Sequence, residues 1–299
     1  MLLARAHAKV NLHLGVGKAR ADGFHELRTI FQSLSLFDEL SLSTTLAESH
    51  ELTVSGLGAD QVPTDGSNLV WRALDAVAQA AGVTEHCAVQ LTKGIPTAGG
   101  MAGGSADAAA ALRLANMQLG QPLSEEQLLA IAADLGSDVP FTLLGETMIG
   151  TGRGEQLVPT ECAATLHWAL AFQDQGLSTP AVFATLDKMR EEDSQLIPSL
   201  DTSAVEKALA VGDVAGLAGL LANDLQAPAL ALLPRLADTL ACGEEAGALR
   251  GIVSGSGPTC AFLCESAESA EDVAAAILGA GVASGTAVAT GPAPGAHLL

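Results

Sequence analysis

Basic and aromatic residues are scarce in this chain of 299 residues. It has 14 lysine and arginine residues against 34 aspartate and glutamate residues, a formal net charge of −20, and it contains no tyrosine. Nucleic-acid-binding proteins hold phosphates mainly with lysine and arginine, so this charge balance disfavours that class of partner. We therefore expect no nucleic-acid partner.

Long apolar runs are also missing. No uncharged apolar segment approaches the roughly 18 to 20 residues that span a bilayer. The first residues are interrupted by Arg5, His7 and Lys9, and they lack the apolar centre and the cleavage region of a signal peptide. These absences predict a cytoplasmic protein that has no membrane partner.

Cysteine is sparse, and the five residues are scattered along the chain. Their odd number does not suit a disulfide framework, and no further His or Cys cluster completes a metal site around them. We expect small buried side chains in a reducing compartment. The cysteines are Cys87, Cys162, Cys242, Cys260 and Cys264.

Hydrophobic residues, in contrast, make up 48% of the chain, and only 16% of the residues are charged. A sizeable core is therefore easy to build, and disorder is not expected. The length favours two domains or one large domain. The clearest seam lies near 155–165, around Pro159, which predicts domains at 1–160 and 161–299.

Strand and helix signals alternate along the whole chain and predict a mixed α/β (α+β) fold. Asn68 caps a helix that ends before Gly82, and Ser124 with Gln127 forms a capping box for another. An Asp-Gly turn at 21–23 and a loosely held tail at 291–294 are also expected. The expected strands are 4–17, 27–43, 87–92, 141–149, 166–172, 251–254, 260–264 and 286–289, and the expected helices are 69–81, 108–119, 124–136, 180–190, several within 202–245, and 270–278.

Basic residues gather near the N-terminus despite their overall shortage. Residues 1–30 hold five lysine or arginine residues and only two acidic ones. A locally basic segment in an acidic protein fits a site for an anionic small molecule. Chance scatter in surface loops is the alternative.

The strongest functional signal is the segment 96–106, Pro-Thr-Ala-Gly-Gly-Met-Ala-Gly-Gly-Ser-Ala, between an expected strand and an expected helix. Glycine lets the backbone turn sharply and approach a ligand closely. The helix, which we expect to open at Ser105 or Asp107, would offer unpaired N–H groups and a positive dipole end. Together they suit the phosphates of a nucleotide, although a flexible turn remains an alternative.

Two further segments carry polar side chains in suggestive positions. Asp138 follows a capped helix and precedes an apolar segment, a position typical of a functional carboxylate and also of a structural turn. Lys9 and Asn11 are two residues apart in an expected strand and so share one face. That face is either solvated or part of a polar cleft.

Together these segments resemble the GHMP kinase superfamily. The match comprises the lysine-containing strand at 8–12, the glycine-rich loop at 96–106 and a turn at 255–259, Gly-Ser-Gly-Pro-Thr. The segments 20–27, 68–70, 136–140 and 179–183 narrow the resemblance to members whose alcohol substrate carries cytidine diphosphate. The most specific part is Arg-Ala-Asp-Gly-Phe-His at 20–25, and the resemblance covers nearly the whole chain.

The resemblance implies an N-terminal nucleotide-binding domain and a C-terminal ferredoxin-like domain with the active site between them. It implies transfer of the γ-phosphoryl group of ATP, with Mg2+, to the tertiary 2-hydroxyl of a methylerythritol unit in isoprenoid precursor synthesis. Asp138 is then the catalytic carboxylate and Lys9 its partner. The implied acceptor contacts are Asn11, Phe24, His25, Thr179 and Phe183, with the rings of Phe24 and Phe183 stacked on cytosine.

The resemblance also places the ATP contacts. They are Asn68, Lys93, Pro96, Thr97, Ala98, Gly99, Gly100, Met101, Ala102, Gly103, Gly104, Ser105 and Ala106. The chain departs from the family at Phe24, where tyrosine is usual, and at Ala98, Ala102 and Ala106 in the loop. Because Ala106 lacks a hydroxyl, only Ser105 remains as a candidate for holding the metal.

Two other interpretations stay open. The chain could be a GHMP kinase for a smaller alcohol, such as homoserine or a mevalonate derivative, but a small acceptor has no base to stack on the aromatic pair. It could also be a nucleotide-binding regulator without catalysis, but such a protein needs neither Lys9 nor Asp138. The small-molecule partners that we expect are ATP and the cytidine-diphosphate-linked polyol.

Overall fold

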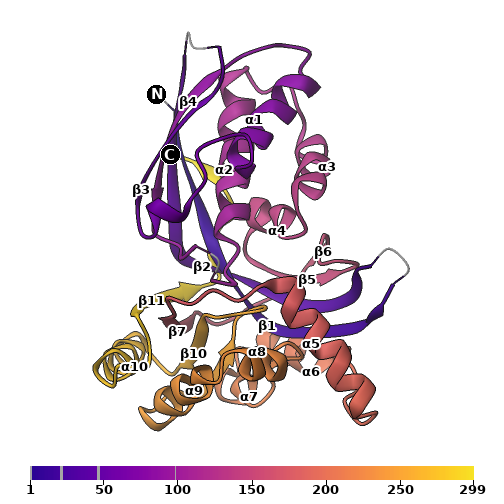
Figure 1. Cartoon of the computed structure of the whole chain (residues 1–299), viewed down its shortest axis with the longest axis vertical. Coiled ribbons are helices and arrows are strands. Elements are labelled where there is room, and N and C mark those ends of the chain that lie inside the picture. The colour runs from indigo at the N-terminus through magenta and orange to yellow at the C-terminus, as the bar shows by residue number, and fades with distance from the viewer. Residues whose placement is uncertain (1, 21–22, 46–47, 98) are drawn as a thin grey trace.

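The computed structural model describes residues 2–20, 23–45, 48–97 and 99–299, and its described strands form two sheets covered by helices (Figure 1). The expected mixed α/β class is confirmed. In chain order the elements are β1 (Leu2–Ala19), β2 (His25–Thr44), β3 (Glu51–Gly56), η1 (Ala59–Gln61), α1 (Leu69–Ala80), β4 (Cys87–Lys93), α2 (Gly103–Gln118), α3 (Glu125–Leu135), α4 (Val139–Leu144), β5 (Thr147–Thr151), β6 (Gln156–Pro159), β7 (Leu166–Phe172), α5 (Thr179–Glu192), α6 (Ser203–Val211), α7 (Val214–Ala218), β8 (Ala222–Asn223), α8 (Gln226–Leu232), α9 (Arg235–Glu245), β9 (Arg250–Val253), β10 (Cys260–Cys264), α10 (Ala267–Gly279), β11 (Gly285–Gly291) and β12 (His297–Leu298).

The antiparallel pair of long strands β1 and β2 links the upper and lower parts of the molecule (Figure 1). Their register shifts between His7 and Lys9 and again between Asn11 and His13. Such irregularities bend a strand and re-aim its side chains, and they are frequent beside functional sites. Here they flank Lys9 and Asn11, the two polar residues that the sequence placed on one face.

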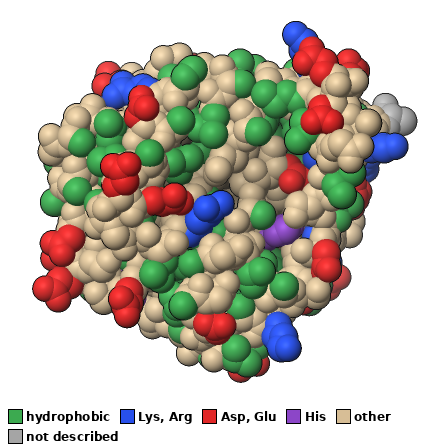
Figure 2. Space-filling view, turned by 90° about the horizontal axis from the view of Figure 1, so that it is seen from below, with side chains coloured by type: hydrophobic (Ala, Val, Ile, Leu, Met, Phe, Trp, Pro, Cys, Tyr) green, Lys and Arg blue, Asp and Glu red, His purple; other side chains and the backbone are tan. Residues whose placement is uncertain are grey.

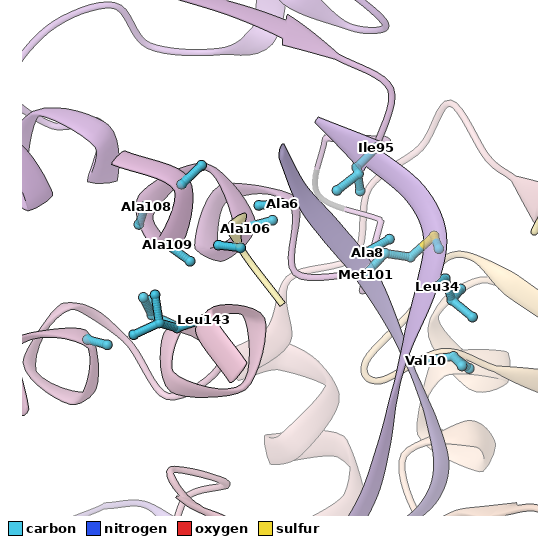
Figure 3. Close-up of a cluster of buried hydrophobic side chains, with 14 of the residues drawn as sticks. Ala6, Ala8, Val10, Leu34, Ile95, Met101, Ala106, Ala108, Ala109 and Leu143 are labelled. Atoms are coloured by element: carbon cyan, nitrogen blue, oxygen red, sulfur yellow. The ribbon is translucent and has the colours of Figure 1, made fainter. Parts of the chain in front are cut away.

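The core of the upper part lies between the first sheet and helices α1 to α4. Helix α2 is rich in alanine, whose small side chains let it lie close to β1, and Ala106, Ala108 and Ala109 are fully buried. Figure 3 shows these alanines facing Leu143 and the side chains of β1, with Ile95 and Met101 of the glycine-rich segment in the same cluster. The glycine-rich segment is therefore anchored in the core by Met101 and by Ile95, which directly precedes it.

Local signals placed most of these elements correctly, with two corrections. Helix α2 begins at Gly103 and not at Ser105 or Asp107, because the turn at Ala102 (φ 60°) already ends the loop. The expected strand at 141–149 is wrong in its first half. Pro140 lies in the first turn of α4, Gly145 at φ 72° ends that helix, and only then does β5 begin.

The second sheet has the strand order β11-β7-β10-β9, and all its pairs are antiparallel. Helix α9 packs against β9 and β10, and α10 packs against β7 and β11. Counted along the chain, this sheet has the order four-one-three-two with crossover helices, which is the ferredoxin-like arrangement. The expected fold of this part is thus confirmed.

The C-terminal tail is held more firmly than the sequence suggested. Strand β12 pairs with β1, where Ala4 lies opposite Leu298, so the two ends of the chain are neighbours (Figure 1). Ala293 is buried, accepts a hydrogen bond from Glu146 N and donates one to Ser33 O. The expectation of a loose tail at 291–294 is therefore wrong, because its backbone is hydrogen-bonded to Ser33 of β2 and to Glu146, and Gly291 pairs with Leu166 of β7.

Candidate active site

A cleft of about 680 Å³ lies where β1, the glycine-rich loop, α5 and the turn at 255–257 meet. Ten of the side chains or backbone positions that the sequence singled out line it together. They are Lys9, Asn11, Phe24, His25, Gly100, Ala102, Ser105, Asp138, Thr179 and Phe183. Together with Gly255 and Ser256 of the turn, residues from distant parts of the chain thus form one site.

The glycine-rich loop is tied to its neighbours through backbone carbonyls. Met101 O accepts from Lys9 N, Gly99 O accepts from Thr259 N, and Gly100 O accepts from Ser254 Oγ. Gly100 has φ 76°, and a Cβ there would lie 2.3 Å from Ser254 O. Glycine is therefore required at this position by both conformation and space.

Helix α2 starts where this loop ends, with Ala102 and Ser105 both lining the cleft. The first amides of a helix have no partner within it, and they carry the positive end of its dipole. Gly104 is exposed here, and a Cβ on it would meet nothing of the protein closer than Leu69 at 4.0 Å. This helix end is suited to bind an anion such as a phosphate group.

Lys9 is held by a chain of buried hydrogen bonds. Its Nζ donates to Asn11 Oδ1 at 2.7 Å, and Asn11 Nδ2 donates in turn to Thr29 Oγ1 at 2.8 Å. Thr29 Oγ1 donates to His13 O, so its lone pairs are left to accept from Asn11, and the donor and acceptor of each hydrogen bond in this series are fixed. Asn11 is therefore oriented with its oxygen toward the ammonium group, and Lys9 is directed into the cleft.

Burial and a nearby carboxylate act on Lys9 in opposite directions. Burial lowers the pKa of the Lys9 ammonium, and the charge of Asp138 partly restores it, with a net lowering. Asp138 lies at the start of α4, and its carboxylate forms no hydrogen bond with any described residue. An ammonium group and an uncommitted carboxylate thus line the same cleft as the N-terminal end of α2.

The other end of the cleft is aromatic. The His25 ring lies 5.0 Å from the ring of Phe183, and Nε2 of His25 is 2.9 Å from Asp187 Oδ1. Phe24 is 49% exposed at the mouth, with the Arg153 guanidinium 5.0 Å from its ring centre. A flat ligand is well held by such faces, combined with the hydrogen-bonding atoms of the histidine.

Two residues expected at the ATP site are committed elsewhere. The Asn68 side chain caps α1 by accepting from Val70 N, and it also donates to Pro63 O. Lys93 is buried in ion pairs with Asp38 and Asp107. Neither side chain lines the cleft.

The remaining loop residues differ in their exposure. Met101 and Ala106 are fully buried in the core. Gly103 lies beneath the loop, where a Cβ would be 3.3 Å from Lys93 Nζ. Ala98 lies outside the described residues, as do positions 21 and 22 of the expected Asp-Gly turn. Pro96, Thr97 and Gly99 shape the loop without lining the cleft.

Sequence reasoning missed Arg153 and Asp187, which both line the cleft. Asp187 lies four residues after Phe183 and therefore on the same face of the expected helix, a signal that could have identified it. Arg153 stands in a turn, where no periodicity indicates a direction. Two basic residues of the N-terminal segment are paired with acidic ones, Arg5 with Glu39 and Arg28 with Glu206. Of the basic residues in that segment, Lys9 is the one found in the described lining of the cleft.

The surface agrees with the acidic composition. On the face seen in Figure 2, acidic side chains are spread between hydrophobic and neutral ones, with only a few basic groups among them. The five cysteines are free thiols; Cys87, Cys260 and Cys264 are buried as expected, whereas Cys162 and Cys242 are partly exposed. Among the described residues, no helix is both long and apolar enough to cross a membrane.

Comparison with known proteins identifies the family. Family models for the GHMP kinases N terminal domain and the GHMP kinases C terminal match residues 68–146 and 205–283. A 4-diphosphocytidyl-2-C-methyl-D-erythritol kinase of Nocardia farcinica is 55% identical over 100% of this chain and 96% of its own length. The chain belongs to the GHMP kinase family. It is an enzyme that phosphorylates an alcohol group, and a kinase of this family uses ATP as its co-substrate.

Other relatives agree with this assignment. The kinase is 52% identical to a 4-diphosphocytidyl-2-C-methyl-D-erythritol kinase of Corynebacterium diphtheriae, covering 99% of this chain and 97% of that one. A crystal structure of 4-(cytidine 5'-diphospho)-2C-methyl-D-erythritol kinase matches with a TM-score of 0.78 at 30% identity, over 96% of this chain and 98% of that one. A homoserine kinase from Cytophaga hutchinsonii, 18% identical, shares the fold with a TM-score of 0.76 over 100% and 97% of the two chains.

Proposed function

We propose that this kinase transfers the γ-phosphoryl group of ATP to the 2-hydroxyl of 4-diphosphocytidyl-2-C-methyl-D-erythritol, a step in isoprenoid precursor synthesis. The relatives at 52–55% identity, which match over nearly their full lengths, are named 4-diphosphocytidyl-2-C-methyl-D-erythritol kinases. The observation that carries the proposal is the composition of one cleft. It has Lys9 and Asp138 in the same lining as the start of α2, and His25 packed against Phe183, with Phe24, at its other end.

Asp138 has the role of general base in this proposal. Its carboxylate is free of hydrogen bonds to described residues, so it can accept the proton of the acceptor hydroxyl. The hydroxyl oxygen then forms a bond to the γ-phosphorus, and the bond from that phosphorus to ADP breaks. Phosphoryl transfer depends mainly on positioning and charge stabilisation, and a side chain placed at the reacting hydroxyl supplies both.

Lys9 stabilises the charge that develops on the transferring group. Its ammonium is buried and fixed by Asn11, so it costs little reorganisation when the reaction occurs. Asn11 acts as the positioning residue of Lys9 and lies where it can also contact the acceptor. The first amides of α2 hold the phosphates of ATP, and the loop backbone from Pro96 to Ala102 shapes that site.

Mg2+ is part of the proposal as the usual companion of ATP. Ser105 lines the cleft and offers a hydroxyl oxygen, a hard ligand of the kind that Mg2+ prefers. No group of three metal-binding side chains occurs among the described residues. One protein oxygen is enough for Mg2+, which is usually held by one or two protein groups together with substrate phosphates, whose charge it would neutralise.

The base end of the cleft recognises cytosine in this proposal. The rings of Phe24 and Phe183 stack on the base, and His25 contacts its polar edge. Thr179, whose hydroxyl is 2.8 Å from that of Ser256, lies beside them. We further propose a cytoplasmic location, no nucleic-acid or membrane partner, and a division into domains 1–160 and 161–299.

An acceptor panel tests the proposal. The protein is incubated with ATP, Mg2+ and either 4-diphosphocytidyl-2-C-methyl-D-erythritol, homoserine or mevalonate, and ADP release is measured. We expect release with the cytidine-containing acceptor alone. Turnover of homoserine or mevalonate instead would indicate a kinase of small alcohols, and ATP binding without any turnover would indicate a regulator.

A further inference from the structure

The side chain of His25 is held from α5 at two points. Phe183 packs against its ring, with centres 5.0 Å apart, and Asp187 Oδ1 lies 2.9 Å from Nε2. Phe183 and Asp187 are four residues apart, so one face of the helix carries both contacts. The His25 side chain is only 7% exposed, whereas that of Asp187 is 41% exposed at the cleft.

The contact with Asp187 determines which ring nitrogen of His25 carries the proton. A carboxylate only accepts hydrogen bonds, so Nε2 of His25 is the donor to Asp187 Oδ1. In a neutral imidazole the other nitrogen, Nδ1, is then an acceptor. Nδ1 has no partner among the described residues, yet it is not among the buried nitrogens closed off from solvent. It is therefore an accessible acceptor in a residue that lines the cleft.

The second carboxylate oxygen of Asp187 adds to this pattern. It has no hydrogen-bond partner among the described residues, and Asp187 lines the cleft. The His25–Asp187 pair thus offers the cleft two acceptors and no donor. A ligand edge that fits such a pair must present a donor, and an edge with a carbonyl oxygen at that place would set lone pair against lone pair.

We infer that Asp187 is a specificity-determining residue, which positions His25 so that the site selects the exocyclic amino group of cytosine over the carbonyl oxygen of uracil. The inference rests on the proposed cytidine-containing acceptor. Asp187 does not touch the reacting atoms, and it acts at the opposite end of the cleft from Lys9 and Asp138. One unpaired buried acceptor corresponds to a loss of about 5- to 150-fold in affinity.

The test changes the hydrogen-bonding character of position 187 without changing its shape. Asp187→Asn can donate from its amide to Nε2, which moves the imidazole proton to Nδ1 and makes that atom a donor. Asp187→Glu keeps the acceptor and serves as the conservative variant. Glu191→Gln removes a charge from an exposed residue one turn further along the same helix, outside the cleft lining, and serves as the matched control.

Two readouts are measured for each variant. The first is kcat/KM for the acceptor linked to cytidine diphosphate and for its uridine analogue, with ATP saturating. The second is the Kd of CDP and of UDP by calorimetry, with ADP in excess to fill the ATP site. We expect the cytidine-to-uridine ratio to fall at least tenfold in Asp187→Asn in both readouts, to recover in part in Asp187→Glu, and to stay at the parent value in Glu191→Gln. The KM of ATP and the melting temperature should not change.

The outcomes separate this inference from the proposed function. If the parent binds CDP in preference to UDP and Asp187→Asn abolishes that preference, the inference holds even if the parent fails to phosphorylate the cytidine-containing acceptor. If the parent phosphorylates that acceptor and Asp187→Asn keeps the full cytidine-to-uridine ratio, the inference is overturned and the proposed function stands. A parent without any preference for CDP over UDP overturns it as well.

Discussion

Replacing Lys93 by methionine distinguishes a structural role for this lysine from the ATP contact that the family resemblance implied. Lys93 Nζ donates to Asp107 Oδ2 at 2.7 Å and to the Asp38 carboxylate. The three side chains are at most 4% exposed. Burial alone would lower the pKa of Lys93, but the charges of Asp107 and Asp38 outweigh it and raise that pKa. The ammonium is therefore the partner of two buried carboxylates.

The expected loss of stability follows from what remains after the substitution. Removing one partner of a buried ion pair costs roughly 3–5 kcal/mol, because the other charge stays buried without compensation. For a chain of this size, such a loss lowers the melting temperature by about 5 to 8 °C. Asp38 also accepts hydrogen bonds from Gly94 N and Ile95 N, where the loop begins, so the KM of ATP should rise as well.

Thermal unfolding by circular dichroism, together with the KM of ATP, measures both effects for Lys93→Met. A triple variant with Asp38→Asn and Asp107→Asn added is the control, since it removes the uncompensated charges and should recover most of the lost stability. If Lys93 served ATP instead, the single variant would raise the KM of ATP and leave the melting temperature within about 2 °C of the parent. That result would refute the structural role.

Two further predictions concern the phosphate site and the catalytic pair. Gly104→Val should raise the Kd of ATP at least tenfold, because the new side chain would take up space proposed for the phosphates. Its circular dichroism spectrum should stay native, because the side chain meets little of the protein. An unchanged Kd by calorimetry would show that the loop is only a structural turn and does not bind phosphate. Burial lowers the pKa of Lys9, so kcat should decline as pH rises through a value below the 10.5 of a free lysine, as the ammonium loses its charge. A profile of kcat against pH in Lys9→Arg, whose guanidinium stays protonated, should lack that decline.

The sequence predicted those parts of the fold that depend on neighbours in the chain. The cap at Asn68 and the box of Ser124 with Gln127 are local contacts, and both are present. The prediction of a strand over the first half of 141–149 was wrong because apolar residues suit a strand and a buried helix equally. Pro140, in the first turn of α4, favours the helix. The tail failed because its partners, in β1 and the segment 142–146, are distant in sequence.

Some residues of the site could likewise be predicted from the sequence, and others could not. The loop was recognisable from its glycines, whereas Lys9 and Asp138 were assigned to the site through the family resemblance. The commitment of Lys93 could not be predicted, because Asp38 lies 55 residues away and Asp107 lies 14 residues away on different elements. The same holds for Asp187, which meets His25 across 162 positions. Long-range pairing of polar side chains leaves no periodic trace in a sequence.

The most direct test of the catalytic assignment is the turnover of Asp138→Asn, measured together with the binding of both substrates. The account predicts that kcat falls by a factor of about 10² to 10⁴, the range typical of a lost general acid–base group. The Kd of ATP and the KM of the cytidine-containing acceptor should stay within a few-fold of the parent, because the phosphate and base ends of the cleft are untouched. A kcat within a few-fold of the parent would show that the proton of the acceptor hydroxyl does not go to Asp138.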